Sequence, residues 1–120
     1  MKLVIKKSEW LWGDGNGRLH DKDLNKSCAM GHYLLSLGYT KEEISPYKCM
    51  DYIAYHLPLI NRPELKKLIY QPNLNERFYA TSLSFSIEHI NDNVFISMKD
   101  RIDRLKELFK TIDVDLEIID

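Results

Sequence analysis

Cys28 and His32 are residues whose types and spacing could do chemistry. Four residues apart, they would share one face of a helix, where a thiolate and an imidazole can ligate a metal ion or pair a nucleophile with a base. A zinc site would also need His20, Cys49 or His56 to converge, and the two cysteines form no CxxC or other zinc spacing. We therefore expect a small core cysteine and a half-exposed histidine, with no catalytic residue, no metal and no cofactor.

The stretch DKDLNK could form a calcium loop. Asp21, Asp23 and Asn25 occupy the first, third and fifth positions of an EF-hand-like pattern. The sixth position, which must be glycine for the sharp bend, is Lys26, and the twelfth, which should be a bidentate glutamate, is His32. A polar turn explains the same residues without a metal ion.

The stretch GDGNG, residues 13–17, could cradle a phosphate group. A phosphate loop opens directly into a helix and carries a GK[ST] sequence, whereas Arg-Leu-His follows here, and the glycines lack the GxGxxG spacing. We predict a tight turn that the neighbouring tryptophans anchor to the core. If the protein instead binds a small molecule or nucleotide, or is an enzyme, we place its pocket at this stretch. The walls and polar groups of that pocket would be Trp10, Trp12, Asp14, Arg18 and His20.

Aromatic residues are numerous for a chain of this size: seven tyrosines, four phenylalanines and two tryptophans. Tyr47, Tyr52 and Tyr55 lie close together in sequence, and Tyr52 and Tyr55 would share one face of a helix. Tyrosine is enriched at protein interfaces because it buries a large area at low entropic cost. We predict that these three tyrosines form part of a partner-binding surface, with packing in the core as the alternative.

The composition is that of one ordinary globular domain spanning residues 1–120. The chain carries 17 Lys and Arg against 18 Asp and Glu, a net charge of −1, which argues against a nucleic-acid partner. A short apolar run near the start is flanked by lysines and is neither a signal peptide nor a membrane span, so we expect a cytoplasmic protein without a membrane partner. No GxSxG or HExxH motif is present, which favours binding over enzymatic catalysis.

Helix signals occupy most of the chain between its ends. Ser27 is the expected N-cap of a helix that stops at Gly38, and Thr40 with Glu43 has the spacing of a capping box. Apolar residues recur at helical spacing in residues 48–57, 63–70 and 75–90. Within the last of these, SLSFSI (residues 82–87) alternates and a strand is the alternative, and residues 91–93, NDN, are predicted to form a turn. Ser97 should cap the last helix. The expected buried stripe of that helix comprises Ile102, Leu105, Leu108, Phe109 and Ile112.

Strand signals lie at the two ends. Residues 2–7 should form a strand whose extended path continues to Trp12, and residues 18–20 a short return strand. Residues 114–118 alternate apolar and acidic side chains, as a half-buried strand does. We predict an α+β fold: a helix-rich single domain with a small sheet that pairs the N- and C-terminal strands and carries the helices on one face.

Several short motifs occur in a characteristic order. They are W-x-x-G-x-G from Trp10, C-x-x-G from Cys28, the NDN stretch, and an R-x-x-x-L-x-x-L-F helix from Arg101 followed by an apolar strand. This layout resembles a family of small uncharacterised proteins found in phages and other mobile elements. The resemblance implies the same fold and a phage-like origin, and it brings no known activity. Ser27 stands where that family often has a first cysteine, so a paired thiol is not expected.

The leading functional hypothesis is an accessory protein of phage or mobile-element type that binds a host protein. Inhibition of host machinery or defence is one form that such binding would take. The alternative is the small-molecule or nucleotide pocket described above. A third hypothesis, nucleic-acid binding, would require a single basic patch formed by Lys6, Lys7, Arg18 and Lys22.

Overall fold

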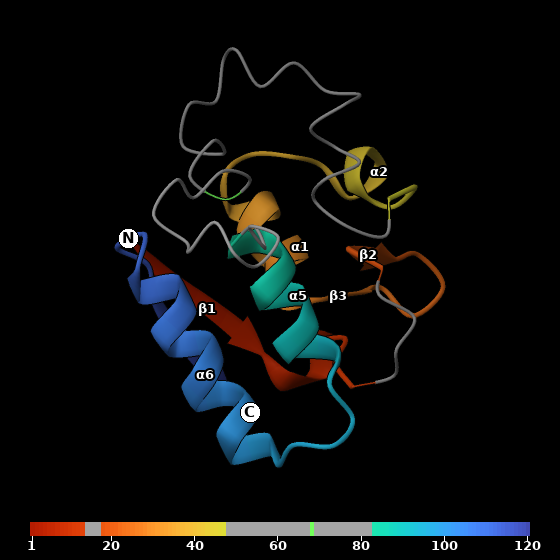
Figure 1. The fold of residues 1–120 in the computed structure, drawn as a ribbon. Coiled ribbons are helices and arrows are strands. Elements are labelled where there is room, and N and C mark those ends of the chain that lie inside the picture. The colour runs from red at the N-terminus through yellow and green to blue at the C-terminus, as the bar shows by residue number, and fades with distance from the viewer. Residues whose placement is uncertain (14–17, 48–67, 69–82) are drawn as a thin grey trace, which may run out of the picture.

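Two strands from opposite ends of the chain pair in parallel (Figure 1). The computed structural model describes residues 1–13, 18–47, 68 and 83–120, and in it β1 (Lys2–Lys6) lies beside β4 (Asp115–Ile119). The register places Leu3 opposite Leu116. This pairing confirms the predicted α+β fold and its link between the two ends of the chain.

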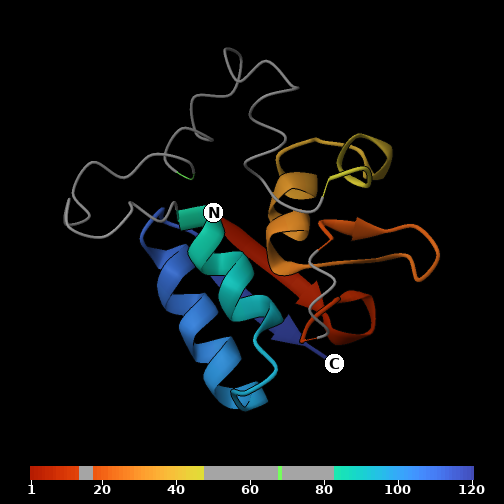
Figure 2. The ribbon, with the colours of Figure 1, turned by 45° about the vertical axis from the view of Figure 1, so that its right-hand side comes forward.

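The β1–β4 sheet buries one of its faces. Leu3 and Ile5 are buried, whereas the residues between them are exposed, because successive side chains of a strand point to opposite faces. The helices α1 (Ala29–Ser36) and α6 (Met98–Lys110) contact β1 and β4 respectively, and α5 (Leu83–Asp92) packs against both helices. In Figure 2, α5 and α6 lie side by side in front of the strands.

The path after β1 differs from the prediction. A 3-10 turn (Lys7–Glu9) interrupts the extended chain, so the expected continuation to Trp12 is wrong, although Trp10 forms a parallel bridge with Ser27. The return strand is β2 (His20–Asp21), which begins two residues later than expected and pairs in antiparallel fashion with β3 (Lys26–Ser27). The polar turn between β2 and β3 is held by the Asp21 carboxylate, which accepts hydrogen bonds from two backbone N–H groups within the turn.

Helix α1 begins one residue later than predicted, with Cys28 rather than Ser27 as its N-cap. Ser27 is part of β3, and its hydroxyl contacts His20, so it is not free to cap the helix. The Cys28 sulfur accepts a hydrogen bond from the Gly31 N–H at 3.3 Å. Gly38 follows the helix with a φ of 103°, which confirms the predicted glycine stop.

The predicted capping box is present at α2 (Lys41–Ile44). The Thr40 hydroxyl accepts from the Glu43 N–H at 3.1 Å, and the Glu43 carboxylate accepts from the Thr40 N–H at 2.9 Å. Ser97 likewise caps α6 as predicted, accepting from the Asp100 N–H at 3.1 Å. Local sequence is sufficient to define these helix starts.

The C-terminal part of the chain forms a hairpin of two helices. Leu105 and Phe109 of the predicted stripe are fully buried, and its other three members pack against the core with partial exposure. The predicted turn over residues 91–93 is corrected, because α5 continues to Asp92. The Asn91 side chain is fully buried rather than solvated, and this burial fixes the last turn of α5 in helical form.

One core cluster joins the strands and helices, with Tyr33 and Phe109 in edge-to-face contact at 5.7 Å. No helix in the described part of the chain is both long and apolar enough to cross a membrane. The helices predicted in residues 48–57 and 63–70, and the first half of the one predicted in residues 75–90, fall outside the described residues, apart from residue 68.

Candidate functional site

Asn91 is a buried polar junction between three parts of the chain. Its side-chain oxygen accepts from the Trp10 indole N–H at 2.8 Å and from the Ala29 backbone N–H at 3.0 Å. Its side-chain nitrogen donates to the Leu11 carbonyl at 2.9 Å and to the Asp92 carboxylate at 2.9 Å. Asn91 therefore ties the end of α5 to the start of α1 and to the segment that leads into GDGNG.

The two tryptophans have different roles. Trp10 is 2% exposed and bonded to Asn91, which confirms that it anchors the chain to the core. Trp12 is 42% exposed, and its ring lies over the Arg101 guanidinium, with 4.8 Å from Cζ to the ring centroid. Trp12 is therefore not a core residue itself, although its ring contacts that of buried Trp10 with 6.0 Å between centroids.

Arg101 is a buried cation that the sequence analysis did not single out. It is 2% exposed, and its Nη2 donates to the Asn93 carbonyl, whereas its Nε has no hydrogen-bond partner within the described structure. Burial lowers the pKa of the guanidinium, and the nearby Asp92 carboxylate raises it by less. A signal was present in the sequence, since Arg101 precedes Leu105 by four residues and Phe109 by eight, on the same buried stripe.

His20, proposed as a polar group of the ligand pocket, is instead part of a buried pair. It is 2% exposed, and its Nδ1 lies 2.6 Å from the Ser27 hydroxyl oxygen. Burial is the main cause that lowers the pKa of the His20 imidazole, and the Lys41 ammonium lowers it further. Arg18, in contrast, is exposed, and Asp14 lies outside the described residues. The structure therefore places Trp10 and His20 inside the fold, where they bond to protein groups.

Cys28 is the N-cap that precedes α1 and His32 lies in the first half of that helix, and each side chain has a structural partner. The Cys28 thiol is buried as the N-cap of α1, and this burial raises its pKa far above the ordinary value. His32 Nε2 lies 2.9 Å from the Glu9 carbonyl oxygen, and burial lowers the pKa of the imidazole. Within residues 1–13, 18–47 and 83–120, no group of three His, Cys, Asp or Glu side chains could hold a metal ion.

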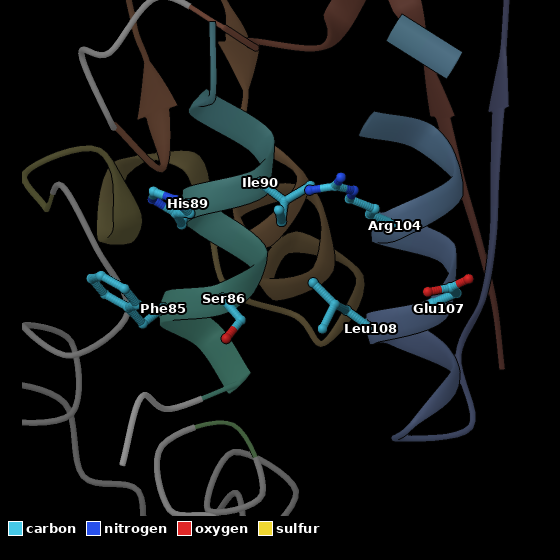
Figure 3. Close-up of a pocket in the computed structure, with 7 residues that line it drawn as sticks. All are labelled: Phe85, Ser86, His89, Ile90, Arg104, Glu107 and Leu108. Atoms are coloured by element: carbon cyan, nitrogen blue, oxygen red, sulfur yellow. The ribbon is translucent and has the colours of Figure 1, made fainter. Parts of the chain in front are cut away.

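An apolar groove of about 410 Å³ lies between α5 and α6 (Figure 3). Its lining residues are Phe85, Ser86, His89, Ile90, Arg104, Glu107 and Leu108. Figure 3 shows Ile90 and Leu108 pointing into the space between the helices, with Phe85 and His89 along the outer side of α5. The Phe85 and His89 rings stack at 6.1 Å, and Phe85 is 49% exposed. The groove is thus open to solvent along an aromatic edge.

The charge next to the groove floor belongs to Arg104. Figure 3 shows its guanidinium reaching towards Ile90, whereas Glu107 lies on the side of α6 away from α5. Arg104 forms no ion pair within 4.0 Å with any residue that the structure describes. The groove thus combines an apolar floor with a basic side chain that has no ion-pair partner in the described part of the chain.

The predicted partner-binding tyrosines are described only in part. Tyr47 is half-buried and packs against the core, and its backbone carbonyl accepts a hydrogen bond from the Leu19 N–H at 3.2 Å. Tyr52 and Tyr55 lie outside the described residues. The groove residues on α5 were missed because residues 75–90 were interpreted only by the helical spacing of their apolar residues, without regard to the other side of the helix. Phe85 and His89, four residues apart and off the Leu83–Ile87 stripe, were the available signal.

Comparison of the chain with protein-family models, with curated proteins and with solved structures found no match.

Proposed function

We propose that this protein acts by binding an amphipathic helix of a protein partner in the groove between α5 and α6. The observation that carries the proposal is the half-exposed Phe85 beside an apolar floor of Ile90 and Leu108. Exposed apolar surface of this kind, bordered by charged groups, is typical of sites where proteins bind other proteins.

The shape of the groove favours a helix as its occupant. Helices α5 and α6 run antiparallel and are joined by the short connection 93–97 (Figure 1). Two neighbouring helices leave a groove into which the side-chain ridge of a third helix can pack. Such a ligand would place apolar residues one turn apart onto the floor, as helix-in-groove complexes do.

The charge of the groove indicates which charged residues the partner helix should carry. Arg104 reaches over the floor without a carboxylate partner among the described residues, so the partner helix should carry Asp or Glu beside its apolar residues. Two further apolar side chains are exposed in the connection between the two helices, where Val94 is 58% and Phe95 94% exposed. A partner longer than the groove would find further apolar contacts there.

The resemblance to phage and mobile-element proteins makes a host protein the expected partner. In that setting the bound helix would belong to host machinery or to a host defence protein, and binding would inhibit it. No catalytic residue is needed for this function.

Affinity capture from a bacterial lysate with matched variants tests the proposal. We expect Phe85→Ala and Arg104→Glu each to weaken capture of the same host protein by at least about tenfold, because central apolar anchors and complementary charges contribute most to such interfaces. A synthetic helix from the captured protein should then bind the wild-type chain in a calorimetric titration and show the same losses.

Two control variants keep the test specific. Leu24→Ala removes an apolar side chain of similar exposure, 56%, in the β2–β3 turn. Lys106→Glu makes the same charge change on α6 at an exposed residue that does not line the groove. Both should capture the partner normally. Equal capture by all four variants, no captured protein, or self-association of the chain through the groove would each overturn the proposal.

A third variant compares the groove with the surface predicted from the sequence. Replacing Tyr47, Tyr52 and Tyr55 together by Ala should leave capture intact if the groove is the binding site. Loss of capture in this variant alone would assign the partner to the tyrosines and remove the groove from the proposed function.

A further inference from the structure

Arg101 carries a buried positive charge that the described structure does not neutralise by a direct ion pair. Its one hydrogen bond there runs from Nη2 to the Asn93 carbonyl, and its Nε is buried with no partner among the described residues. Buried polar groups in proteins are almost always paired, and an unpaired one calls for an unseen partner such as an ion. A buried charge without a counter-charge is more costly still.

Nearby groups compensate for this charge only in part. The Asp92 carboxylate raises the pKa of Arg101, but it also accepts a hydrogen bond from Asn91 at 2.9 Å. Burial has the larger effect, so the pKa of the guanidinium is lowered overall. Arg101 also lies one turn inside the N-terminal end of α6, where the helix dipole disfavours a cation. A bound anion would supply a counter-charge to the buried guanidinium, and the dipole at this end of α6 would favour it, so it would offset both unfavourable effects.

The surroundings of the guanidinium include a route to solvent. Trp12 lies over it at 4.8 Å, is 42% exposed, and forms no hydrogen bond through its indole with any described residue. Trp10, by comparison, is fixed by its bond to Asn91. Rotation of Trp12 about its side-chain bonds would give up its tilted ring contact with Trp10, 6.0 Å between centroids, but would keep the hydrogen bond of Trp10 to Asn91 and would uncover Arg101.

Gly13 lies against a second side of the guanidinium and has no side chain of its own. A Cβ at this position would lie 3.6 Å from Arg101 Nη2, and the φ of 71° favours glycine. The backbone is nevertheless fixed, since the Gly13 N–H donates to the Asn91 carbonyl at 3.0 Å.

We propose that Arg101, covered by Trp12 and flanked by Gly13, binds the oxyanion group of a small molecule. The planar guanidinium presents its N–H donors in a fork that matches a phosphate or a carboxylate. Trp12 turns aside when the anion enters and then lies against the bound group. This site is separate from the α5–α6 groove, and its occupation does not depend on a protein partner.

The experiment follows the Nε–H resonances of the arginines by NMR while the full chain is titrated with inorganic phosphate at constant ionic strength. We expect the Arg101 resonance to shift and saturate, and the resonance of Arg104, three residues along the same helix, to remain nearly unchanged. Tryptophan fluorescence should change over the same concentration range in the wild type. The Trp12→Phe variant should lose the fluorescence change and keep the Arg101 shift.

A parallel titration with acetate separates the two kinds of oxyanion. Saturation with phosphate alone assigns a phosphorylated ligand, and saturation with acetate alone or with both assigns a carboxylate or a general oxyanion site. Arg101→Lys keeps the charge but loses the fork, so it should bind at least about tenfold more weakly. If this variant does not fold, the wild-type titration still tests the proposal, because it compares the shift of the Arg101 Nε–H resonance with that of Arg104. Equal, unsaturated shifts of both arginines, or no shift of Arg101 with either anion, would overturn the proposal.

Discussion

Gly31 is the residue at which the backbone of α1 comes closest to another segment. A Cβ at this position would lie 2.0 Å from the Leu19 carbonyl oxygen, a distance that no real contact permits. The same region is joined by a backbone hydrogen bond from the Cys28 N–H to that carbonyl at 3.2 Å. The glycine of the C-x-x-G motif is therefore required by packing between α1 and the segment before β2.

Gly31→Ala should destabilise the protein by at least about 2 kcal/mol, because the clash is with backbone and can be relieved only by moving α1. A loss of stability would be diagnostic, because replacing a glycine inside a helix by alanine ordinarily increases stability by about 0.5–1 kcal/mol. Urea unfolding followed by tryptophan fluorescence measures the difference. Ser36→Ala, at the exposed last residue of α1, is the control; it removes only the hydroxyl's hydrogen bond to the Tyr33 carbonyl and should change stability far less. A Gly31→Ala protein as stable as the wild type would contradict the close approach.

At the scale of elements, Asn91 holds three segments in place through one side chain. Its side chain forms buried hydrogen bonds with the Trp10 indole, the first N–H of α1 and the Leu11 carbonyl. Removing this side chain leaves each of those groups without its partner in the interior. An unsatisfied buried donor or acceptor costs about 1–3 kcal/mol.

Asn91→Ala should therefore lower the free energy of unfolding by about 3 kcal/mol or more. Trp10 fluorescence should also shift to the red as its pocket admits water. Asn93→Ala is the matched control, because the Asn93 side chain makes an exposed bond to the Phe95 N–H and should cost about 1 kcal/mol or less. Similar losses in the two variants would show that Asn91 is not the junction inferred here.

These elements also show what sequence can and cannot predict. The capping box at Thr40, the Ser97 cap and the strands at both ends were predictable because their signals are local: cap residues at fixed spacing and alternating side chains. Asn91 was assigned to a turn because Asn-Asp-Asn is turn-like locally, and its role depends on Trp10, 81 residues away. The same limit applies to Arg101 and to the groove, because each needs the partner element in place before its function can be recognised.

At the scale of the whole molecule, the pairing of β1 with β4 and the shared core join the described elements from the two ends of the chain into one packed unit. The register joins Leu3 to Leu116, and the N-terminal ammonium donates to the Asp113 carbonyl at 3.1 Å. We expect contacts between the two ends to form late in folding, because the entropy of the intervening chain must first be lost. The terminal strands and the helices on their buried face share one core cluster, so they should unfold together rather than separately.

Stability of this unit should depend on pH through two histidines. Burial is the main cause that lowers the pKa values of His20 and His32, and the hydrogen-bond contact of His32 with the Glu9 carbonyl offsets this only in part. Both imidazoles are therefore neutral in the folded state at neutral pH and bind protons more readily when the chain unfolds. Their contribution to stability is complete above the unfolded pKa of about 6.5 and is lost as the pH falls through the folded values.

We expect the free energy of unfolding to fall between about pH 7.5 and 5.5, above the range where carboxylates titrate. Each unit by which a histidine pKa is lowered corresponds to about 1.4 kcal/mol once that group is protonated. Urea unfolding across this range measures the slope, and His20→Gln and His32→Gln should each reduce it even where they lower stability at every pH. The slope is the informative quantity. A packing defect lowers the free energy of unfolding by the same amount at every pH, whereas loss of a titrating group changes how that free energy varies with pH. A wild-type protein with pH-independent stability would show that neither histidine is held neutral by burial.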